Sequence, residues 1–172
     1  MLTKIDLCSM ALLKLGETPI QSLSDDTAAA KLGRTLTDFV IDTLLSMHPW
    51  RFACHTYDVP RNEDGDIVIP SDVLRVLKTD GQIMENKIIA HTDSARIVAI
   101  VRVAPDEFPS YFASLVATKL AVEFCMPLIS DQTVFRTLVA LYETELQTAK
   151  FIDSTTSANI GIENFSLINS RF

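Results

Sequence analysis

The chain has 172 residues, of which 48% are hydrophobic and 22% are charged. This length fits one domain that buries roughly two thirds of its unfolded surface, and the composition excludes disorder along most of the chain. The 22 acidic and 15 basic residues give a net charge of −7, which argues against tight, sequence-independent binding of nucleic acid because such binding needs Lys and Arg to replace counterions. The charge is compatible with a surface past which DNA slides without being held.

Membrane spans, secretion signals and disulfides are not indicated. No apolar run approaches the ~20 residues that span a bilayer, and the first segment repeats its hydrophobic residues at helical spacing, unlike a signal peptide. The three cysteines, Cys8, Cys54 and Cys125, are odd in number and widely spaced, with no CxxC pair. We therefore expect a soluble protein made in a reducing cytoplasm, with no membrane partner.

The first predicted helix spans about Lys4 to Leu15. Thr3 and Asp6 match a capping box, in which two backbone donors at the helix start are satisfied reciprocally. Gly16 is a natural left-handed stop. The expected apolar stripe is Ile5, Cys8, Leu12 and Leu15.

The second predicted helix is the longest amphipathic element and ends at His48-Pro49. Ser24 is its expected N-cap, followed by two acidic residues at the positive end of the helix dipole. Gly33 is either a weak point costing ~1 kcal/mol relative to Ala or a site of close approach by another helix. The expected buried face is Leu32, Leu36, Phe39, Val40, Thr43, Leu44 and Met47.

The only tryptophan of the chain directly follows this helix. Pro49 stops the helix, and Trp50 and Phe52 are expected to enter the core behind it. We predict that these three residues are structural anchors at the junction between a helical bundle and the segment that follows.

After Tyr57 the hydrophobic pattern changes from helical to strand-like. Short β-branched segments predict a small antiparallel sheet of three or four strands with one covered face. Asp80-Gly81 is a dipeptide typical of hairpins, and a further turn is expected near Glu85-Asn86. The expected strand segments are 67–69, 73–78, 83–90 and 97–103.

Two more helices are predicted beyond this sheet. The third spans about Ser110 to Met126 and ends before Pro127, because proline cannot continue a helix. The fourth begins at Ser130-Asp131 and reaches about Phe151. Its expected core stripe is Val134, Phe135, Leu138, Leu141, Tyr142 and Leu146.

The predicted fold is mainly α within the α+β class. About four helices form a bundle (1–56 and 104–152), and an antiparallel β insertion (57–103) lies between helices two and three. Bundle and insertion are expected to form a single domain over 1–152. An extended C-terminal arm (153–172) follows.

The C-terminal arm is polar in composition yet retains apolar residues throughout. A solvated tail has no use for them, so the arm either packs on its own domain or docks on another subunit. We favour docking on a partner, since termini are ordered only when something holds them. The apolar residues are Ile160, Ile162, Phe165, Leu167, Ile168 and Phe172.

No group of residues has catalytic spacing. The carboxylates at Asp25-Asp26 and in the Glu63–Asp66 turn are explained by helix capping and by a solvated turn. Nothing in the sequence orients His91 toward Cys125 as a nucleophilic pair, and the glycines form no phosphate cradle. We expect no catalytic residues and no cofactor.

A metal site is also not expected. His48, Cys54 and His55 lie close in sequence, but their spacing matches no zinc pattern. His48 is better explained by the negative end of a helix dipole, and Cys54 by a place in the core.

Four segments, taken in order, carry a family resemblance. They are IDLCSMALLKLGETPIQSLSDDT, then LLSMHPWRFA, then IPSDVLRVL, and finally EFPSYFASLVATKLAVEFCMPL with LYETELQTAK. Over about residues 3 to 152 they resemble the tail tubular protein A proteins, the head-to-tail adaptors (connectors) of tailed bacteriophages and prophages. The specific part is HPW-x-FA followed by IPSDVLRVL and FP-x-x-F.

The resemblance implies a structural subunit of the virion without a catalytic site. Such subunits form a ring, typically a dodecamer, at the head–tail junction after synthesis in the host cytoplasm. The ring binds the portal protein, extends its channel, helps to complete the DNA-filled head and offers a platform for the downstream tail or nozzle protein. DNA passes through the channel without specific binding.

Two other functions stay open. A small helical binding or chaperone-like module would hold a partner peptide in a persistent apolar groove. An enzyme of unrecognised type would strongly perturb the titration of a histidine or cysteine.

Overall fold

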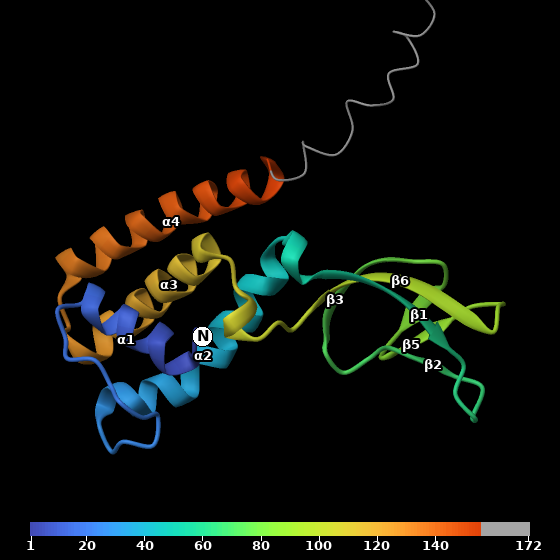
Figure 1. Cartoon of the computed structure of the whole chain (residues 1–172), viewed down its shortest axis with the longest axis horizontal. Helices are drawn as coiled ribbons and strands as arrows, with labels where there is room; N and C mark the ends of the chain where they lie inside the picture. Colours follow the sequence, from blue (N-terminus) through green and yellow to red (C-terminus); the bar gives the residue numbers. More distant parts are fainter. Residues whose placement is uncertain (156–172) are drawn as a thin grey trace, which may run out of the picture.

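The computed structural model describes residues 1–155 of the chain. The six apolar residues of the predicted C-terminal arm, from Ile160 to Phe172, lie outside the described residues. The described part belongs to the mixed α+β class, as predicted: a helical bundle stands beside a β module (Figure 1).

The helices are α1 (Lys4–Lys14), α2 (Ala28–Met47), α3 (Ser110–Leu128) and α4 (Gln132–Thr155). The strands are β1 (Cys54–Pro60), β2 (Ile67–Val68), β3 (Val73–Thr79), β4 (Gln82–Met84), β5 (Lys87–Ile89) and β6 (Ser94–Val101). Two 3-10 turns, Arg51–Ala53 and Pro105–Glu107, lie where the chain enters and leaves the β module.

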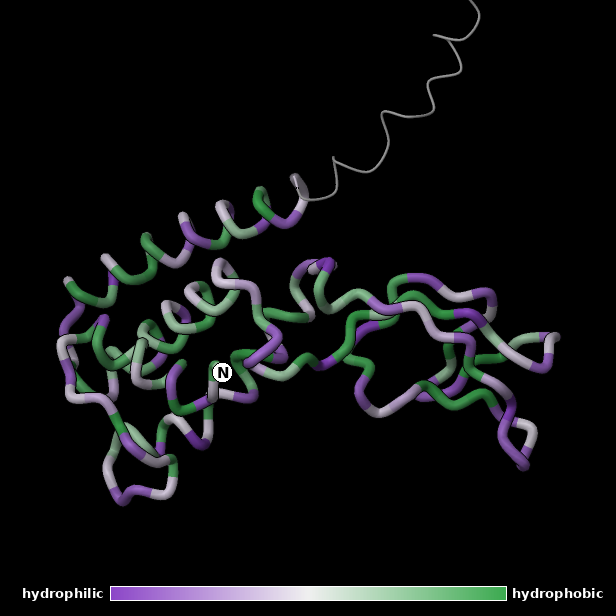
Figure 2. Tube along the Cα trace, viewed as in Figure 1, coloured by the Kyte–Doolittle hydropathy of each residue, from purple (hydrophilic) through white to green (hydrophobic). Residues whose placement is uncertain are grey.

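The centre of the bundle is α3, which contacts α1, α2 and α4. Among the described residues it is the one helix long and apolar enough to cross a membrane, yet most of it is buried inside the bundle, as in the core helix of many globular proteins. Hydrophobic and hydrophilic residues alternate along α4, which covers α3 from one side (Figure 2). An amphipathic helix of this kind buries one face and leaves the other in solvent.

The start of α1 has the predicted capping box. The Thr3 side chain accepts a hydrogen bond from the Asp6 backbone N–H at 3.2 Å, and the Asp6 carboxylate accepts one from the Thr3 backbone N–H at 2.8 Å. Gly16 has a φ of +76°, the left-handed conformation expected after the helix. The predicted stripe was only partly right, because Ile5 and Leu15 are only half-buried. The buried residues of α1 are Leu7, Cys8, Ala11 and Leu12.

The start of α2 differs from the prediction. Thr27, not Ser24, is the N-cap, and its side chain accepts a hydrogen bond from the Ala30 N–H at 3.1 Å. Asp25 instead accepts a bond from the Ser22 N–H within the preceding turn. The acidic side chain is thus used by the turn, and the helix begins after it.

The buried face of α2 also differs from the prediction. Phe39 and Met47 are exposed, at 68% and 47% of their surface, although both were expected in the core. The buried residues are Ala30, Gly33, Thr37, Val40, Ile41, Leu44 and Leu45. The small residues among them bring α2 close to α1, so the true buried stripe is rotated from the one that the large apolar residues suggest.

Gly33 lies at this close approach. A Cβ placed there would lie 3.0 Å from Leu23 Cδ2 and 3.1 Å from Cys8 Sγ. Of the two explanations that the sequence left open, tight helix packing therefore accounts for this glycine.

The β module consists of two three-stranded antiparallel sheets, where one sheet of three or four strands was expected. Their strand orders are β1-β6-β3 and β2-β5-β4. Strand β1 was not predicted, and Asp80-Gly81 does not close a hairpin, because β3 and β4 belong to different sheets. The predicted turn at Glu85-Asn86 does connect β4 to β5.

The strand β6 links two hydrophobic cores. Ala95, Ile97 and Ala99 pack in a small core between the sheets, whereas Ile100 and Val101 join the main core of the bundle. The module therefore has a core of its own and is fused to the bundle through the end of its central strand.

The third helix continues through Pro127, where the sequence predicted its end. Pro127 is the penultimate residue of α3, so the loss of its N–H affects only the last turn. Ser130, with a φ of +58°, ends the helix, and its N–H donates to the carbonyl of Cys125 at 3.1 Å.

The fourth helix extends to Thr155, beyond the predicted end near Phe151. In its predicted core stripe, Leu138 and Leu146 are buried but Leu141 is 40% exposed. Ala149 and Asp153 complete the buried face.

Candidate interaction surfaces

The corner after α2 is built on Trp50. Its side chain is fully buried, and its indole N–H donates to the carbonyl of Leu44 at 2.7 Å. Leu44 belongs to the last turn of α2, whose carbonyls lack ordinary helical partners, so the indole caps the helix. Phe112 of α3 packs edge-on against it with ring centroids 5.1 Å apart. Pro49 at this corner is exposed, and Phe52 is half-buried.

Asp153 fastens the end of α4 to the same corner. Its carboxylate is almost fully buried and accepts hydrogen bonds from the Arg51 backbone N–H at 3.2 Å and from the Tyr111 hydroxyl at 2.9 Å. His48 Nε2 lies 3.6 Å from the same carboxylate. Three segments remote in sequence therefore meet at one buried acid.

The pKa of the Tyr111 hydroxyl is raised well above its ordinary value. Burial is the largest cause, followed by the hydrogen bond to Asp153 and the negative charge of that carboxylate. Tyr111 therefore stays neutral at high pH and remains a donor to Asp153.

Exposed apolar side chains form three separate surfaces. On α2, Phe39 and Met47 line a shallow hollow of about 460 Å³ together with Asp42, Thr43 and Ser46. We call this the α2 hollow. It is flanked by two arginines of the β module that are bonded to its lining residues.

These arginines are Arg102 and Arg75. Arg102 pairs with the Asp42 carboxylate with two hydrogen bonds, one of them at 2.8 Å, and Arg75 donates to the carbonyl of Ser46 at 2.9 Å. The pKa of Arg102 is raised by its hydrogen bond and by the charge of Asp42. The α2 hollow thus has an apolar floor between Phe39 and Met47, and the two arginines at its side are already paired with Asp42 and with the Ser46 carbonyl.

The second surface is the outward face of the β2-β5-β4 sheet. Val68, Lys87 and Met84 are register partners across this sheet and share one face. Val68 is 40% and Met84 is 61% exposed, and Ile89, two residues after Lys87 on β5, is 50% exposed. The opposite face carries the buried Ile67 and Ile88, whereas Ile83, on the same face of the edge strand β4, is 48% exposed.

The third surface is the outer stripe of α4. Leu141 and Phe151 are 40% and 68% exposed and lie about ten residues apart, with Thr144 and Thr148 between them at helical spacing. We refer to it as the α4 stripe. It faces away from α3, the helix that α4 covers.

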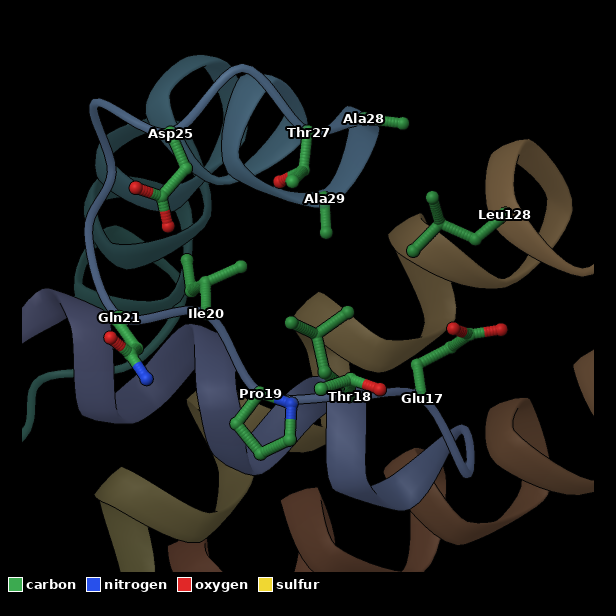
Figure 3. Close-up of a pocket in the computed structure, with 11 residues that line it drawn as sticks. Glu17, Thr18, Pro19, Ile20, Gln21, Asp25, Thr27, Ala28, Ala29 and Leu128 are labelled. Carbon is green, nitrogen blue, oxygen red and sulfur yellow. The ribbon is translucent and has the colours of Figure 1, made fainter.

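A further hollow, of about 410 Å³, lies between the α1–α2 connection and the end of α3. Figure 3 shows Ile20 and Leu128 pointing into this hollow from opposite sides, with Pro19 on the connecting loop. Glu17 and Asp25 are the titratable groups of its lining. Because its lining contains no histidine, cysteine or lysine, the hollow offers space for an apolar group without an adjacent nucleophile and base.

The histidines and cysteines considered from the sequence lie apart. Among residues 1–155 no group of three or more His, Cys, Asp or Glu side chains is placed to hold a metal ion. His91 lies in the β module, whereas Cys125 is buried in α3 and contacts the carbonyl of Asp131 at 3.7 Å. Burial raises the pKa of the Cys125 thiol. Cys54, expected in the core, is only half-buried on β1.

No pattern in the sequence indicates Asp153 as a structural centre. Its partners lie 42 and 102 positions away along the chain, and a single acidic residue near the end of a helix is usually solvated.

None of the known protein-family models matches the chain, and a search of curated proteins found no match.

Proposed function

We propose that the chain is a head–tail adaptor subunit that assembles into a ring on a phage portal. The observation that carries the proposal is the pair of exposed apolar surfaces on different layers of the molecule, the outward face of β2-β5-β4 and the α4 stripe. The family resemblance over about residues 3 to 152 points to the same role.

Two different surfaces on one subunit favour contacts of the head-to-tail kind. A two-fold dimer buries the same patch on both copies, whereas a ring joins one patch to a different one on the next copy. Large apolar side chains such as Met84 and Phe151 are typical of the buried centres of such contacts. The charge of Lys87, which lies between Val68 and Met84 on the sheet face, is paired with the Asp66 carboxylate of the same module.

In this proposal the four helices form the ring wall and the β module projects from it as an insertion. The ring, of twelve subunits by analogy with the family, extends the portal channel and presents a platform to the downstream tail or nozzle protein. The net charge of −7 would keep the passing DNA from adhering to the channel. The C-terminal arm would dock on a neighbouring subunit or on the portal, and no cofactor or enzymatic step is needed.

The direct test is electron cryomicroscopy of portal particles mixed with the protein. We expect annular density added at the portal vertex. Unchanged portal particles at saturating protein would rule the proposal out, whereas a monomer in the absence of portal would be compatible with it.

Paired variants test the two contact surfaces. Met84→Asp and Phe151→Asp should each abolish the ring while leaving the circular dichroism and melting of the monomer unchanged. Ser71→Asp and Gln132→Asp add the same charge at exposed positions of the β module and of α4 that lie outside the two surfaces, and these variants should still form rings. Rings that tolerate both Met84→Asp and Phe151→Asp would exclude these surfaces.

The second candidate is a small binding or chaperone-like module that holds a partner peptide. The hollow of Figure 3 favours it, because its volume of about 410 Å³ is within the usual range for a small ligand site. Leu128→Trp should fill the hollow. Under this candidate the variant loses partner binding, whereas a ring-forming adaptor keeps its assembly on the portal.

A further inference from the structure

Among residues 1–155 the β module has four edge strands, and three of them carry features that hinder pairing with another chain. Strands β2 and β4 are only two and three residues long, and β3 has two register irregularities along β6. Short edges and bulges are the means by which natural sheets avoid edge-to-edge pairing. Strand β1 has neither, because its seven residues run in unbroken register beside β6 (Figure 1).

Alternate residues of β1 turn their backbone groups away from β6. The Arg61 N–H donates to the Asp93 carbonyl at 2.9 Å, and this bond continues the register of β1 with β6. In an antiparallel ladder only every second pair of residues exchanges hydrogen bonds, so the odd-numbered residues of β1 are the ones bonded to β6. The even-numbered residues, Thr56 and Asp58 among them, therefore direct their N–H and C=O groups outward.

The outward groups face solvent. Thr56 and Asp58 are exposed, and within residues 1–155 no second strand pairs with β1 on this side. The Cys54 N–H is used by the Arg51 carbonyl, which leaves the Cys54 carbonyl as an outward acceptor. Pro60 ends this row, since it has no N–H to donate. We call the outward backbone groups of Cys54, Thr56 and Asp58 the β1 edge.

The hydrogen-bonding pattern of the β1 edge is complementary to itself. In an antiparallel pair with Thr56 opposite Thr56 of the partner subunit, these two residues exchange both of their hydrogen bonds. Each Asp58 N–H then faces a Cys54 carbonyl of the other copy, so every outward donor has an acceptor. A shift by two residues one way brings Pro60 into the ladder, and a shift the other way leaves Asp58 unpaired.

The side chains beside this contact do not oppose it. Asp58 is paired with Arg96 of its own subunit at 2.9 Å, which balances its charge. In the proposed register a cysteine lies opposite this acid, so no two like charges face each other across the pair. Thr56 at the centre is β-branched, a type of side chain that suits a pleated surface.

We propose that β1 is a site of strand addition for a second copy of this chain. Two subunits join edge to edge about a two-fold axis at Thr56, and their β1-β6-β3 sheets become one continuous sheet. In contacts of this kind the main-chain hydrogen bonds supply the affinity. The contact uses neither the outward face of β2-β5-β4 nor the α4 stripe, so it stands or fails independently of the adaptor ring.

A disulfide at the axis tests the register. Residues that exchange hydrogen bonds across an antiparallel pair have Cα atoms about 5.5 Å apart, within the range of about 4.4–6.8 Å that a disulfide accepts. The two other cysteines, Cys8 and Cys125, are buried. In a Cys54→Ser background, Thr56→Cys should form a disulfide-linked dimer about tenfold faster than Ser71→Cys, because pairing raises the effective concentration of its thiols. Ser71 is exposed in the β module outside β1, and equal rates for the two variants would overturn the proposal.

Amide hydrogen exchange in the full-length chain identifies what covers the edge. The Thr56 and Asp58 N–H groups should exchange about tenfold more slowly at millimolar than at micromolar protein, because exchange must then wait for the dimer to open. The Tyr57 N–H, which faces β6, should not depend on concentration. Protection at every concentration would assign the edge to another segment of the same chain, and fast exchange throughout would leave it open; both results refute the second copy.

Proline at the axis separates the dimer from the fold. Thr56→Pro removes an outward N–H without removing a bond to β6, so the variant should keep its circular dichroism and become monomeric in sedimentation equilibrium. Thr56→Val keeps the N–H and should still form the dimer. A dimer that survives Thr56→Pro would show that the β1 edge is not the contact.

Discussion

Replacement of Trp50 tests how the corner after α2 is held. The Trp50→Phe substitution retains an aromatic ring against Phe112 but removes the indole donor to the Leu44 carbonyl, a bond of 2.7 Å. A buried acceptor left without its partner costs about 1–3 kcal/mol. We therefore expect Trp50→Phe to lower the free energy of unfolding by that amount.

The Trp50→Ala substitution adds a cavity to this loss. Removal of a fully buried tryptophan side chain costs about 3–5 kcal/mol from lost packing alone. Because domains of this kind are stable by only about 5–15 kcal/mol, the alanine variant should be close to unfolded at room temperature. The two variants together separate the hydrogen bond from the volume of the ring.

Urea unfolding followed by far-ultraviolet circular dichroism is the appropriate assay, since the variants lack the only tryptophan fluorophore. The slope of free energy against urea should be the same in all variants, which indicates that only stability has changed. Phe151→Leu, at a position 68% exposed, is the control and should stay within about 0.5 kcal/mol of the wild type. A loss below about 1 kcal/mol for Trp50→Ala would refute the buried anchor.

Three further predictions concern single contacts. The pKa of Tyr111 is higher in the folded protein than its value of about 10 in the unfolded chain. Tyr111 therefore stabilises the fold below about pH 10, and this contribution is lost as the pH rises further. Tyr111→Phe should flatten the fall of urea stability above that pH, and an unchanged slope would contradict this. Gly81→Ala places a Cβ 2.6 Å from the Ile89 carbonyl oxygen and should lower the melting temperature, whereas an unchanged melting temperature would disprove the close approach. Asp153→Ala should cost about 1–3 kcal/mol and speed amide exchange at Arg51, and slow exchange there would show that the bond is dispensable.

Local signals in the sequence predicted the parts of the fold that are determined locally. Thr3, Asp6 and Gly16 act within one or two turns of their own position, and the structure places them as predicted. The stop at His48-Pro49 and the burial of Trp50 are likewise confirmed. Each depends on backbone geometry or on size, which neighbours in the sequence reveal.

The errors occur where distant contacts decide. Strand β1 has the weak pattern of an exposed edge, and its partner β6 lies about forty residues later. Phe39 was assigned to the core because it is large and apolar, but small residues such as Gly33 form the true contact with α1. Asp153 could not have been found, because its burial depends on two segments that the sequence does not place near it.

An ion pair and a set of aromatic contacts join the β module to the bundle, and they differ in how strongly they stabilise the junction. Arg102 pairs with Asp42, but both side chains are partly exposed, at 56% and 28%, and exposed pairs contribute at most about 1 kcal/mol. The aromatic contacts at the junction involve the buried side chains Phe108 and Phe112. Phe52, before β1, and Phe108, after β6, each pack edge-on against Phe112 with centroids 4.9 Å apart.

Both chain connections to the β module therefore rest on one residue of α3, directly beside Trp50. Loss of an ion pair such as Arg102 with Asp42 would leave the aromatic cluster intact and should barely change the orientation of the module. Loss of Phe112, in contrast, would loosen both connections at once, because it would leave Phe52 and Phe108 only their longer contact with each other, at 6.1 Å, and that of Phe52 with Trp50, at 6.4 Å. The angle between module and bundle is thus set by packing behind the His48-Pro49-Trp50 stop, and the surface arginines only adjust it.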